Sequence, residues 1–523
     1  MTTHSRKHRF GVAATGTVAA LAAFALALPA HAANPPDTLR VGVNSKSPAR
    51  GNPFAAGFSV PNAYFWVPIF DSLTRVNNKG QTLPMLAESW SVGDDKLTWT
   101  FVVKKNVVYS NGEPFNAAAV AATFDYLLKD DKGKTTNAAS VLRGVKEVTA
   151  SGDDKVIVKT EKPDPLLAGT LATISIVGPK AWREMGVEAF TQMPVGTGPW
   201  KVEKWTDTET SLVLNPTSYR PGKIPKMTIT EIPEVVARGQ AVLSEQIDIA
   251  TNLGPDDVTR IRAAGHQADI ATSPNIQSIA LFTEDFSPNK KWGDKGTPFR
   301  DKRVRQAMNY AIDRDSIIKN LVNGITKPAS QPANPATFGY NPDVKPYPYD
   351  PAKAKALLTE AGYANGFKFV SEVLQGFSPN DKEIWTQVSE SVGKLGVQME
   401  LRPVPFSDWL RKYLNGTWEG ESMTLALLVE PHMDAIRPFQ NYSCLFAKAF
   451  TCIPEHMPLI EAASQEMDPV KREKMLKDLM KVMHDDALSI AIQENVEIAG
   501  LNKRVRGFTN SNKIFLYENV TFQ

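Results

Sequence analysis

The sequence predicts an α/β protein with mixed sheets and more than one domain. Segments of alternating, β-branched residues are interleaved with segments in which apolar residues recur at helical spacing. Beyond an export-like N-terminal segment the chain continues for about 490 residues, which exceeds what one hydrophobic core usually serves. Strands that alternate with helices over such a length indicate α/β units.

Strands dominate the first half of the predicted order. TLRVGVN, which opens this series, alternates like a half-buried strand, and the later segments follow the same pattern. The strands are expected at 38–44, 96–104, 155–161, 211–215, 226–232 and 247–250. Helices are predicted at 63–73, 116–129 and 237–244; in the second of these Val120, Phe124 and Leu127 share one face.

Helices and strands alternate more evenly in the second half. Helices are predicted at 301–311, 351–361, 381–395 and 470–483, and the first two open with charged or proline-bearing first turns. Strands are predicted between them at 367–374, 397–404 and 422–429. The proline-rich stretch 327–348 reads as a connection without a core of its own.

The N-terminus has the pattern of a secretory signal peptide. Arg6, Lys7 and Arg9 precede an apolar, alanine-rich run at 11–28, and Pro29-Ala-His-Ala follows it. This predicts cleavage after Ala32, with a retained membrane anchor as the alternative. Removing the peptide lowers the formal net charge from +3 to 0, so neither nucleic acid nor an anionic membrane surface is expected as a partner.

The two cysteines, Cys444 and Cys452, lie close together in the sequence. An exported protein folds in an oxidising compartment, which favours a local disulfide between them. The alternative is a pair of free, buried thiols.

Searches for catalytic motifs fail. The chain contains no Gly-x-Ser-x-Gly and no His-Glu-x-x-His, and its three Ser-x-x-Lys matches lack a Lys-Thr-Gly element. The histidines of the mature chain are too scattered to predict a metal site, and His484 is expected at the solvated surface. We therefore expect no enzyme, no catalytic residue, no cofactor and no bound metal.

Four motifs carry a family resemblance. They are LTWTFVVKKNVVYSNGEPFNAAAVAATFDYLL at 97–128, PVGTGPWKVEKWT at 194–206, PFRDKRVRQAMNYAIDRDSII at 298–318 and YDPAKAKALLTEAGYANGF at 349–367. In this order and spacing they resemble the extracellular solute-binding proteins of ABC transporters, family 5, the dipeptide, oligopeptide and nickel-binding type.

The resemblance implies a periplasmic-binding-protein-like, two-lobed fold with an extra inserted domain, mixed sheets and a hinge cleft. After the signal peptide, 1–32, domain I would consist of 33–70, 197–283 and 500–523, the inserted domain II of 71–196, and domain III of 284–499. Gly196 and Gly198 are expected to allow the backbone angles at which the chain re-enters domain I.

The resemblance also implies a function. The protein would be a periplasmic monomer that captures short peptides in the interlobe cleft and delivers them to an inner-membrane permease with cytoplasmic ATPases. A nickel chelate, glutathione, an opine or an oligosaccharide are alternative cargoes, because one architecture can serve many ligands. A secreted hydrolase and a periplasmic chaperone or receptor adaptor are alternatives of other classes.

Two segments are expected to line the cleft. The resemblance places Ser59, Val60 and Asn62 on one wall, and Phe406, Tyr413, Glu430, His432 and Asp434 on the other. Peptide binders of this family commonly show Trp-x-x-Asp in the second segment, where the carboxylate holds the ligand's ammonium. The tryptophan is absent here, so Glu430 or Asp434 would take that role by a charge-assisted hydrogen bond.

Overall fold

The fold is described from a computed structural model. The described residues are 37–523 except 288–289, 375–379, 426–431, 446–448 and 512–513, so the predicted signal peptide lies outside them. Residues 36–523 form one compact unit. No helix in this described part of the chain combines the length and apolar character that a membrane span requires.

A ten-stranded mixed sheet organises the unit, in the order β14-β13-β15-β12-β16-β11-β1-β10-β9-β8. β1 is parallel to β10 and β11, whereas β12 is antiparallel to β15 and β16. The strands are β1 (Thr38–Val43), β8 (Trp200–Trp205), β9 (Glu209–Leu214), β10 (Lys226–Glu231), β11 (Ile249–Ala250), β12 (Gln267–Leu281), β13 (Lys368–Leu374), β14 (Gln398–Val404), β15 (Ser422–Thr424) and β16 (Ser489–Leu501).

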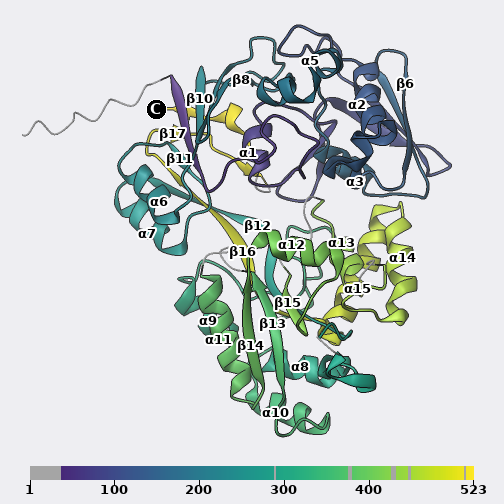
Figure 1. Cartoon of the computed structure of the whole chain (residues 1–523), viewed down its shortest axis with the longest axis vertical. Helices are drawn as coiled ribbons and strands as arrows, with labels where there is room; N and C mark the ends of the chain where they lie inside the picture. Colours follow the sequence, from purple (N-terminus) through teal and green to yellow (C-terminus); the bar gives the residue numbers. More distant parts are fainter. Residues whose placement is uncertain (1–36, 288–289, 375–379, 426–431, 446–448, 512–513) are drawn as a thin grey trace, which may run out of the picture. The chain divides into compact units, whose positions relative to one another are not determined.

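β12 and β16 join the two halves of this sheet (Figure 1). They have 15 and 13 residues and pair from Gln267 opposite Leu501 to Ala280 opposite Ser489. The register shifts between Thr272 and Ile276 and again just after Gln277. Bulges of this kind bend a strand and increase its twist. Each of the two strands therefore runs from one half into the other, but their pairing is irregular in the middle.

A second, antiparallel sheet has the order β4-β5-β7-β6. Its strands are β4 (Ala87–Val92), β5 (Thr98–Val103), β6 (Val145–Ser151) and β7 (Lys155–Thr160). α2 (Ala117–Lys129) packs on it, and the Asn116 side chain caps α2 by accepting a hydrogen bond from the Ala119 N–H. The short strands β2 (Thr74–Val76) and β3 (Thr82–Pro84) form a separate pair.

The remaining helices cover the sheets and connect their strands (Figure 1). Asp301, Asp350 and Asp468 cap α8, α10 and α15, each by accepting a hydrogen bond from a backbone N–H of the first turn. The helices are α1 (Asn62–Trp66), α3 (Asn137–Ser140), α4 (Leu167–Thr170), α5 (Pro179–Gln192), α6 (Val235–Leu243), α7 (Pro255–Ala263), α8 (Lys302–Tyr310), α9 (Arg314–Leu321), α10 (Pro351–Glu360), α11 (Asp381–Gly393), α12 (Phe406–Asn415), α13 (Ile436–Asn441), α14 (Met457–Gln465) and α15 (Pro469–Asp486).

The apolar interior is divided between the two halves of the large sheet. One cluster gathers around Trp66 and Trp200, and includes the four-stranded sheet. Another gathers around Trp409 and Phe439, and a third around Trp385. Each half of the large sheet therefore packs mainly on apolar clusters of its own.

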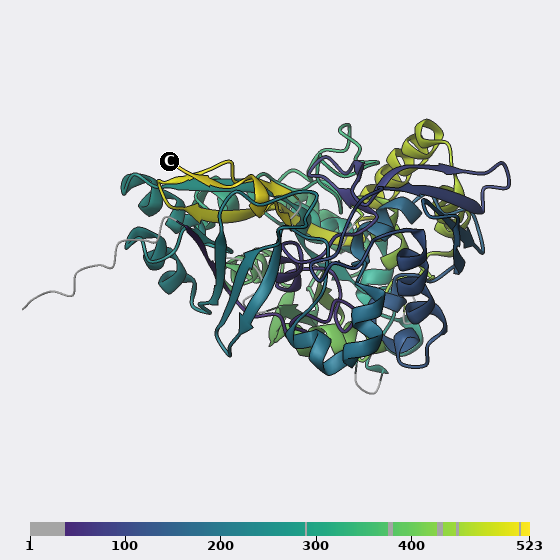
Figure 2. The same ribbon diagram turned by 90° about the horizontal axis from the view of Figure 1, so that it is seen from above.

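The C-terminal segment returns to the first strand (Figure 2). The buried Asp248 carboxylate, which precedes β11, accepts hydrogen bonds from Arg40 of β1 and from Arg504, at 2.9 and 2.8 Å. Arg504 follows β16, so one carboxylate holds together three segments that are distant in sequence.

Gly196 is required for a reason other than the expected one. Its φ is not positive, so unusual backbone angles do not explain it. A Cβ at Gly196 would instead collide with the carbonyl oxygen of Ile69, and one at Gly198 with the carbonyl of Pro68. The two glycines serve close approach of two backbones.

Candidate functional site

The first expected wall is a loop that ends in α1. Ser59 is exposed and Val60 is partly buried. The Asn62 side chain is buried and fully engaged: its Oδ1 accepts from Ser47 Oγ at 2.7 Å, and its Nδ2 donates to the Gly57 carbonyl at 3.0 Å. Asn62 thus shapes the loop, while Ser59 and Val60 are the members of this wall left at the surface.

The second wall begins with an aromatic row on α12. Phe406, Trp409 and Tyr413 recur at helical spacing, and neighbouring rings stack with centroids 6.1 and 5.1 Å apart. Trp409 is buried whereas Phe406 is 41% exposed. The Tyr413 hydroxyl donates to Asn441 Oδ1 at 2.9 Å, and burial raises the pKa of Tyr413 to about 12. In this row Phe406 is the exposed ring, Trp409 is buried, and Tyr413 adds a polar group at the end.

His432 bridges two distant parts of the chain. Its Nε2 lies 2.8 Å from Thr170 Oγ1 of α4, 262 residues away, and the residue is only 9% exposed. Burial, helped by the positive charge of Arg437, lowers the pKa of His432 to about 3. Among the described residues its Nδ1 has no hydrogen-bond partner. The wall therefore holds an uncharged imidazole with one unused nitrogen.

Asp434 is occupied by a buried arginine. Arg472 of α15 donates from Nη1 to Oδ2 at 2.6 Å and from Nη2 to Oδ1 at 2.9 Å, and both side chains are buried. Oδ1 also accepts from the Ile436 N–H, which begins α13. A carboxylate in a bidentate pair of this kind is already neutralised, which weighs against the expected ammonium role. Glu430, the other candidate, lies outside the described residues.

Only part of the expected site is held together by direct bonds. Within the described chain, no hydrogen bond or ion pair joins Ser59, Val60 or Asn62 to Phe406, Tyr413, His432 or Asp434. Val60 packs on the first core and Tyr413 on the second, so the two walls belong to different halves.

The β2–β3 region reaches the second wall directly. A Cβ at Gly80 would lie 3.2 Å from the Met433 Cβ, and Val76 and Ala172 share the core of Trp409.

Sequence reasoning missed Arg437, on α13. It is partly buried, and no carboxylate in the described chain forms an ion pair with it. Burial lowers the pKa of Arg437; the nearby Tyr413 and Asp434 oppose that shift, and the charge of Arg143 adds to it. Since Asp434 already pairs with Arg472, Arg437 is a cation without a dedicated counter-ion in this region.

Asp164 lies in the segment that leads into α4, and after Asp434 it is the second carboxylate whose charge interacts with that of Arg437. It accepts a hydrogen bond from the Leu166 N–H at 2.9 Å. Burial raises the pKa of Asp164, and the charges of Arg472 and Arg437 oppose that rise. A single Asp in a loop gives no recognisable signal in a sequence. The environment of Asp164 is set by burial and by arginines that are distant in the sequence.

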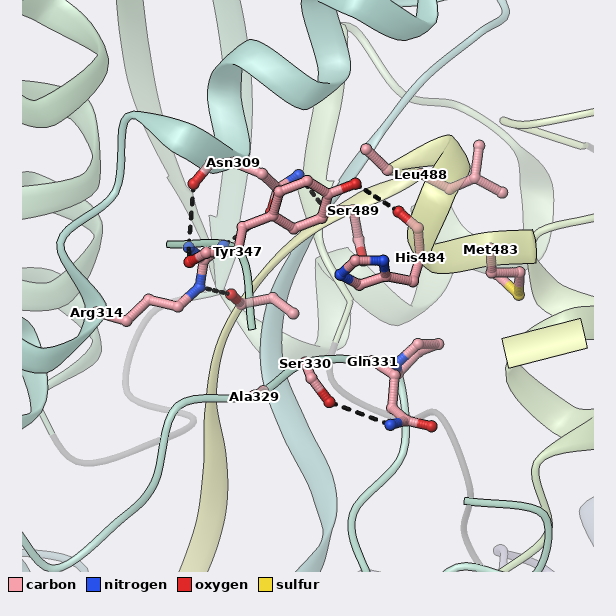
Figure 3. Close-up of a pocket in the computed structure, with 13 residues that line it drawn as sticks. Asn309, Arg314, Ala329, Ser330, Gln331, Tyr347, Met483, His484, Leu488 and Ser489 are labelled. Carbon is pink, nitrogen blue, oxygen red and sulfur yellow. Dashed lines mark hydrogen bonds between the residues drawn. The ribbon is translucent and has the colours of Figure 1, made fainter. Parts of the chain in front are cut away.

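A separate pocket lies beneath the other end of α15 (Figure 3). Arg314 lines it, and its guanidinium donates to the carbonyls of Ala491 and Asn309 at 2.6 and 3.0 Å and to Asn309 Oδ1 at 2.7 Å. Burial lowers the pKa of Arg314 to about 10. Because most of its donors are used by the chain itself, Arg314 holds these segments together.

His484 is not the surface residue that the sequence suggested. Its ring stacks on Tyr347 with centroids 4.5 Å apart, and the Tyr347 hydroxyl donates to the His484 carbonyl at 2.6 Å (Figure 3). Burial lowers the pKa of His484. The aromatic neighbour, 137 residues away in sequence, leaves the His484 side chain only 19% exposed.

Cys444 and Cys452 form a disulfide just after α13. The described chain contains no free cysteine. Nor does it contain a group of three histidine, cysteine or acidic side chains placed to hold a metal ion.

Separate apolar clusters in the two halves, a sheet shared by both and polar contacts between distant segments fit a two-lobed binding protein. A model of the bacterial extracellular solute-binding proteins, family 5, middle region, matches residues 81–424. The chain belongs to this family of extracellular solute-binding proteins. Its members are substrate-binding transport proteins.

Two relatives match most of the chain. Heme-binding protein A of Haemophilus influenzae is 26% identical over 466 residues, which cover 82% of each protein. The dipeptide-binding protein of Escherichia coli is 24% identical over 478 residues, 84% of this chain and 86% of the relative.

The fold has a solved counterpart as well. The structure of HbpA2 from Haemophilus parasuis superposes with a TM-score of 0.80 at 21% identity, covering 93% of this chain and all of that one. The periplasmic-binding-protein-like, two-lobed fold expected from the sequence is thereby confirmed.

Proposed function

We propose that this protein is the periplasmic solute receptor of an ABC importer, with short peptides as its leading cargo. Membership of the solute-binding family supports the receptor role, and the similarity to a dipeptide-binding protein supports peptides as the cargo. The solute would lie between the two halves, in contact with Ser59 and Val60 on one side and with Phe406, Tyr413 and His432 on the other. It would pass to inner-membrane permease subunits driven by cytoplasmic ATPases.

The shared sheet supports a hinge. β12 and β16 are the strands that link both halves, and their middle is irregular and polar: Gln493 Nε2 donates to Gln277 Oε1 at 2.8 Å, and Thr326 donates to Gln493 Oε1 at 2.8 Å. Bending at a few residues between two rigid cores is the usual way in which such proteins close. With the domain limits proposed from the sequence, β12 lies at the end of the domain I segment 197–283. β16 lies mostly within domain III, 284–499, and its last two residues begin the domain I segment 500–523.

A nickel chelate is a second candidate cargo. The observation that favours it is the uncharged imidazole of His432, whose Nδ1 has no partner among the described residues. Neutral imidazole is the commonest protein ligand of transition metals. One histidine supplies one bond, so the chelator would have to provide the others.

Export and the absence of catalysis complete the proposal. The protein would be cleaved after Ala32, act as a monomer and perform no chemistry on its cargo. Intact-mass measurement of the exported protein tests the first point, because a mass that retains residues 1–32 contradicts it. Incubation with peptide mixtures tests the last, since cleavage products would make the protein a hydrolase.

The decisive experiment is native mass spectrometry of the protein purified from its own periplasm. A co-purifying peptide or chelate would identify the cargo. Small-angle scattering, before and after that cargo is added back, should show a smaller radius of gyration in the complex. A protein that retains no solute and keeps an unchanged profile with peptide and chelate libraries would contradict the receptor proposal.

A further inference from the structure

The pocket beneath α15 lies apart from both walls proposed for the cargo. Its lining comes from α8, α9, the connection that follows α9, the end of α15 and the start of β16, and includes no residue of either wall. Its free volume is about 20 Å³, which exceeds the roughly 10 to 15 Å³ that one water molecule needs on the same measure. The pocket therefore admits one water molecule or one ion of similar size, and is too small for a peptide.

Arg314 of α9 brings a positive charge to this pocket. It is buried, with 4% of its surface exposed. Within the described chain each hydrogen bond of its guanidinium goes to a carbonyl or amide oxygen, and none goes to a carboxylate. Nη2 has one such acceptor, Asn309 Oδ1 at 2.7 Å, so its second N–H has none there. Because a buried cation without a counter-ion is costly, the pocket favours a negative charge.

The His484 ring projects into the same pocket (Figure 3). Its Nδ1 lies 3.4 Å from Asp485 Oδ1, and since a carboxylate can only accept, the proton of the neutral ring lies on Nδ1. Nε2 is buried and has no hydrogen-bond partner among the described residues. In the neutral ring, Nε2 is an acceptor that a water molecule can satisfy. In the charged ring, it becomes a second cationic donor in a pocket that Arg314 already lines.

The other groups that face the ring leave its charge open to change. Burial lowers the pKa of His484, and the charge of Lys481 adds to that shift. Asp485 and the Lys345 carbonyl act in the opposite direction on the same pKa. Lys481 and Asp485 also pair with each other at 2.9 Å, while Tyr347 covers one face of the ring. An anion inside the pocket would stabilise the protonated ring and so oppose the effect of burial.

We infer that Arg314 and His484 form a binding site for one small monovalent anion of the chloride type, which enters together with a proton. Nε2 takes the proton from solvent, and the anion then accepts from Nε2–H and from the second N–H of Arg314 Nη2. The proton and the anion cancel in charge, so the net charge of the pocket stays the same. Hydrogen bonds from ionised donors are roughly twice as strong as neutral ones. The ion would tie α9 to the end of α15, independently of any cargo.

Bromide is the probe for the position of the ion, because it replaces chloride and scatters X-rays anomalously. Crystals of the full exported protein, grown at pH near 5.5 and soaked in sodium bromide, should show an anomalous peak between Arg314 and His484. A pocket that holds only water, in crystals that show bromide elsewhere on the protein, would overturn the inference.

Thermal unfolding in solution tests the coupling to a proton. Chloride should raise the thermal midpoint above that in gluconate of equal ionic strength, because gluconate is too large for the pocket. Since a proton enters with the ion, the affinity should improve by up to about tenfold per unit of falling pH while the free ring is neutral. The same chloride response at pH near 8 and near 5.5 would contradict a site that includes the ring.

Two variants separate this site from general ionic effects. His484→Phe keeps an aromatic ring to stack on Tyr347 but removes both nitrogens, so it should fold and lose most of the chloride response. Arg303→Gln removes an exposed arginine of α8 that pairs with Asp301, and as the control it should respond like the wild type. Arg314 is left unchanged because its carbonyl contacts hold the fold. A full chloride response in His484→Phe would overturn the inference.

Discussion

Arg472 donates one hydrogen bond to each carboxylate oxygen of Asp434, at 2.6 and 2.9 Å, and this buried pair joins α15 to the start of α13. Arg472 also donates from Nε to the Ala463 carbonyl at 3.0 Å and lies over the ring of Phe338. Both partners are thus fully engaged inside the second core. The carboxylate for which the family resemblance suggested a ligand role therefore also fixes the start of α13, between His432 and Arg437.

Breaking this pair should destabilise the protein. Asp434→Asn would leave Arg472 buried without its counter-charge, which typically costs about 3 to 5 kcal/mol. Urea unfolding should show that loss without any ligand present. Lys474→Ala, which removes an exposed pair with Asp478 on the same helix, is the control and should leave the midpoint nearly unchanged. An Asp434→Asn protein as stable as the wild type would contradict this structural role and would favour Asp434 as a ligand-binding residue.

His432 should make the folded state sensitive to acid. Its pKa is about 3 in the folded state because of burial and the charge of Arg437, against about 6.5 when unfolded. The unfolded state therefore binds a proton first, and stability is lost as the pH falls from 6.5 toward 3. His432 should contribute about 2 kcal/mol of that loss between pH 6.5 and 4.5.

His432→Gln isolates this contribution. Urea unfolding of both proteins across the same pH range should show a shallower decline for the variant. Its amide nitrogen can still reach Thr170, so the comparison mainly removes the titrating group. Parallel curves for the two proteins would show that His432 is accessible to protons in the folded state.

The disulfide should stabilise the loop after α13. Cys444 and Cys452 close a short ring, separated by 8 positions, for which loop entropy gives about 2 to 3 kcal/mol. The double variant Cys444→Ser/Cys452→Ser should lose roughly that amount in unfolding experiments, and reductant should lower the wild type to the same level. A reductant effect on the double variant itself would point to another cause.

Asp248 should be critical for the junction of the chain ends. Its carboxylate is fully buried and serves Arg40 and Arg504. Asp248→Asn leaves two arginines short of a counter-charge, so we expect a loss of about 3 to 5 kcal/mol. Glu245→Gln removes an exposed neighbouring pair with Lys503 and is the control. Thermal unfolding of both variants tests this prediction. An Asp248→Asn midpoint equal to that of Glu245→Gln would contradict the role assigned to Asp248.

Local patterns predicted most of the individual elements. Alternation placed β5, β7, β10, β13 and β14 within a residue or two, and a proline-bearing first turn marked α10. The predicted helix at 63–73 ends at Trp66 instead. The alternating pattern at 422–429 is a strand over Ser422–Thr424, and 426–429 lie outside the described residues.

The two strands that join the halves were missed. The sequence of β12 contains Pro274, and proline normally argues against an interior strand. β16 carries Gln493, Glu494 and Asn495 in its middle, which interrupts the apolar alternation. In both strands the sequence signal is lost near the segment where the register shifts, because these residues interrupt the apolar alternation.

The resemblance suggests a segment for the candidate site, but the role of each residue in it depends on the fold. The resemblance pointed to the stretch that contains His432 and Asp434. It could not show that Asp434 is taken by Arg472, 38 residues away, or that Thr170 reaches His432 across 262 residues. Which polar groups remain unpaired depends on the whole fold, so the lack of an ion pair between Arg437 and any described residue is visible only in three dimensions.

The shared sheet also limits how this protein can be divided. The last residues of β12 pair with β15, while its first residues lie beside the C-terminal end of β16. A fragment that begins after β12 would expose the unpaired backbone of two neighbouring strands, which invites aggregation. Neither half is a module that can be excised by a single cut in the chain. New specificities are therefore better sought by substitutions along α12 and α13 than by exchanging lobes between relatives.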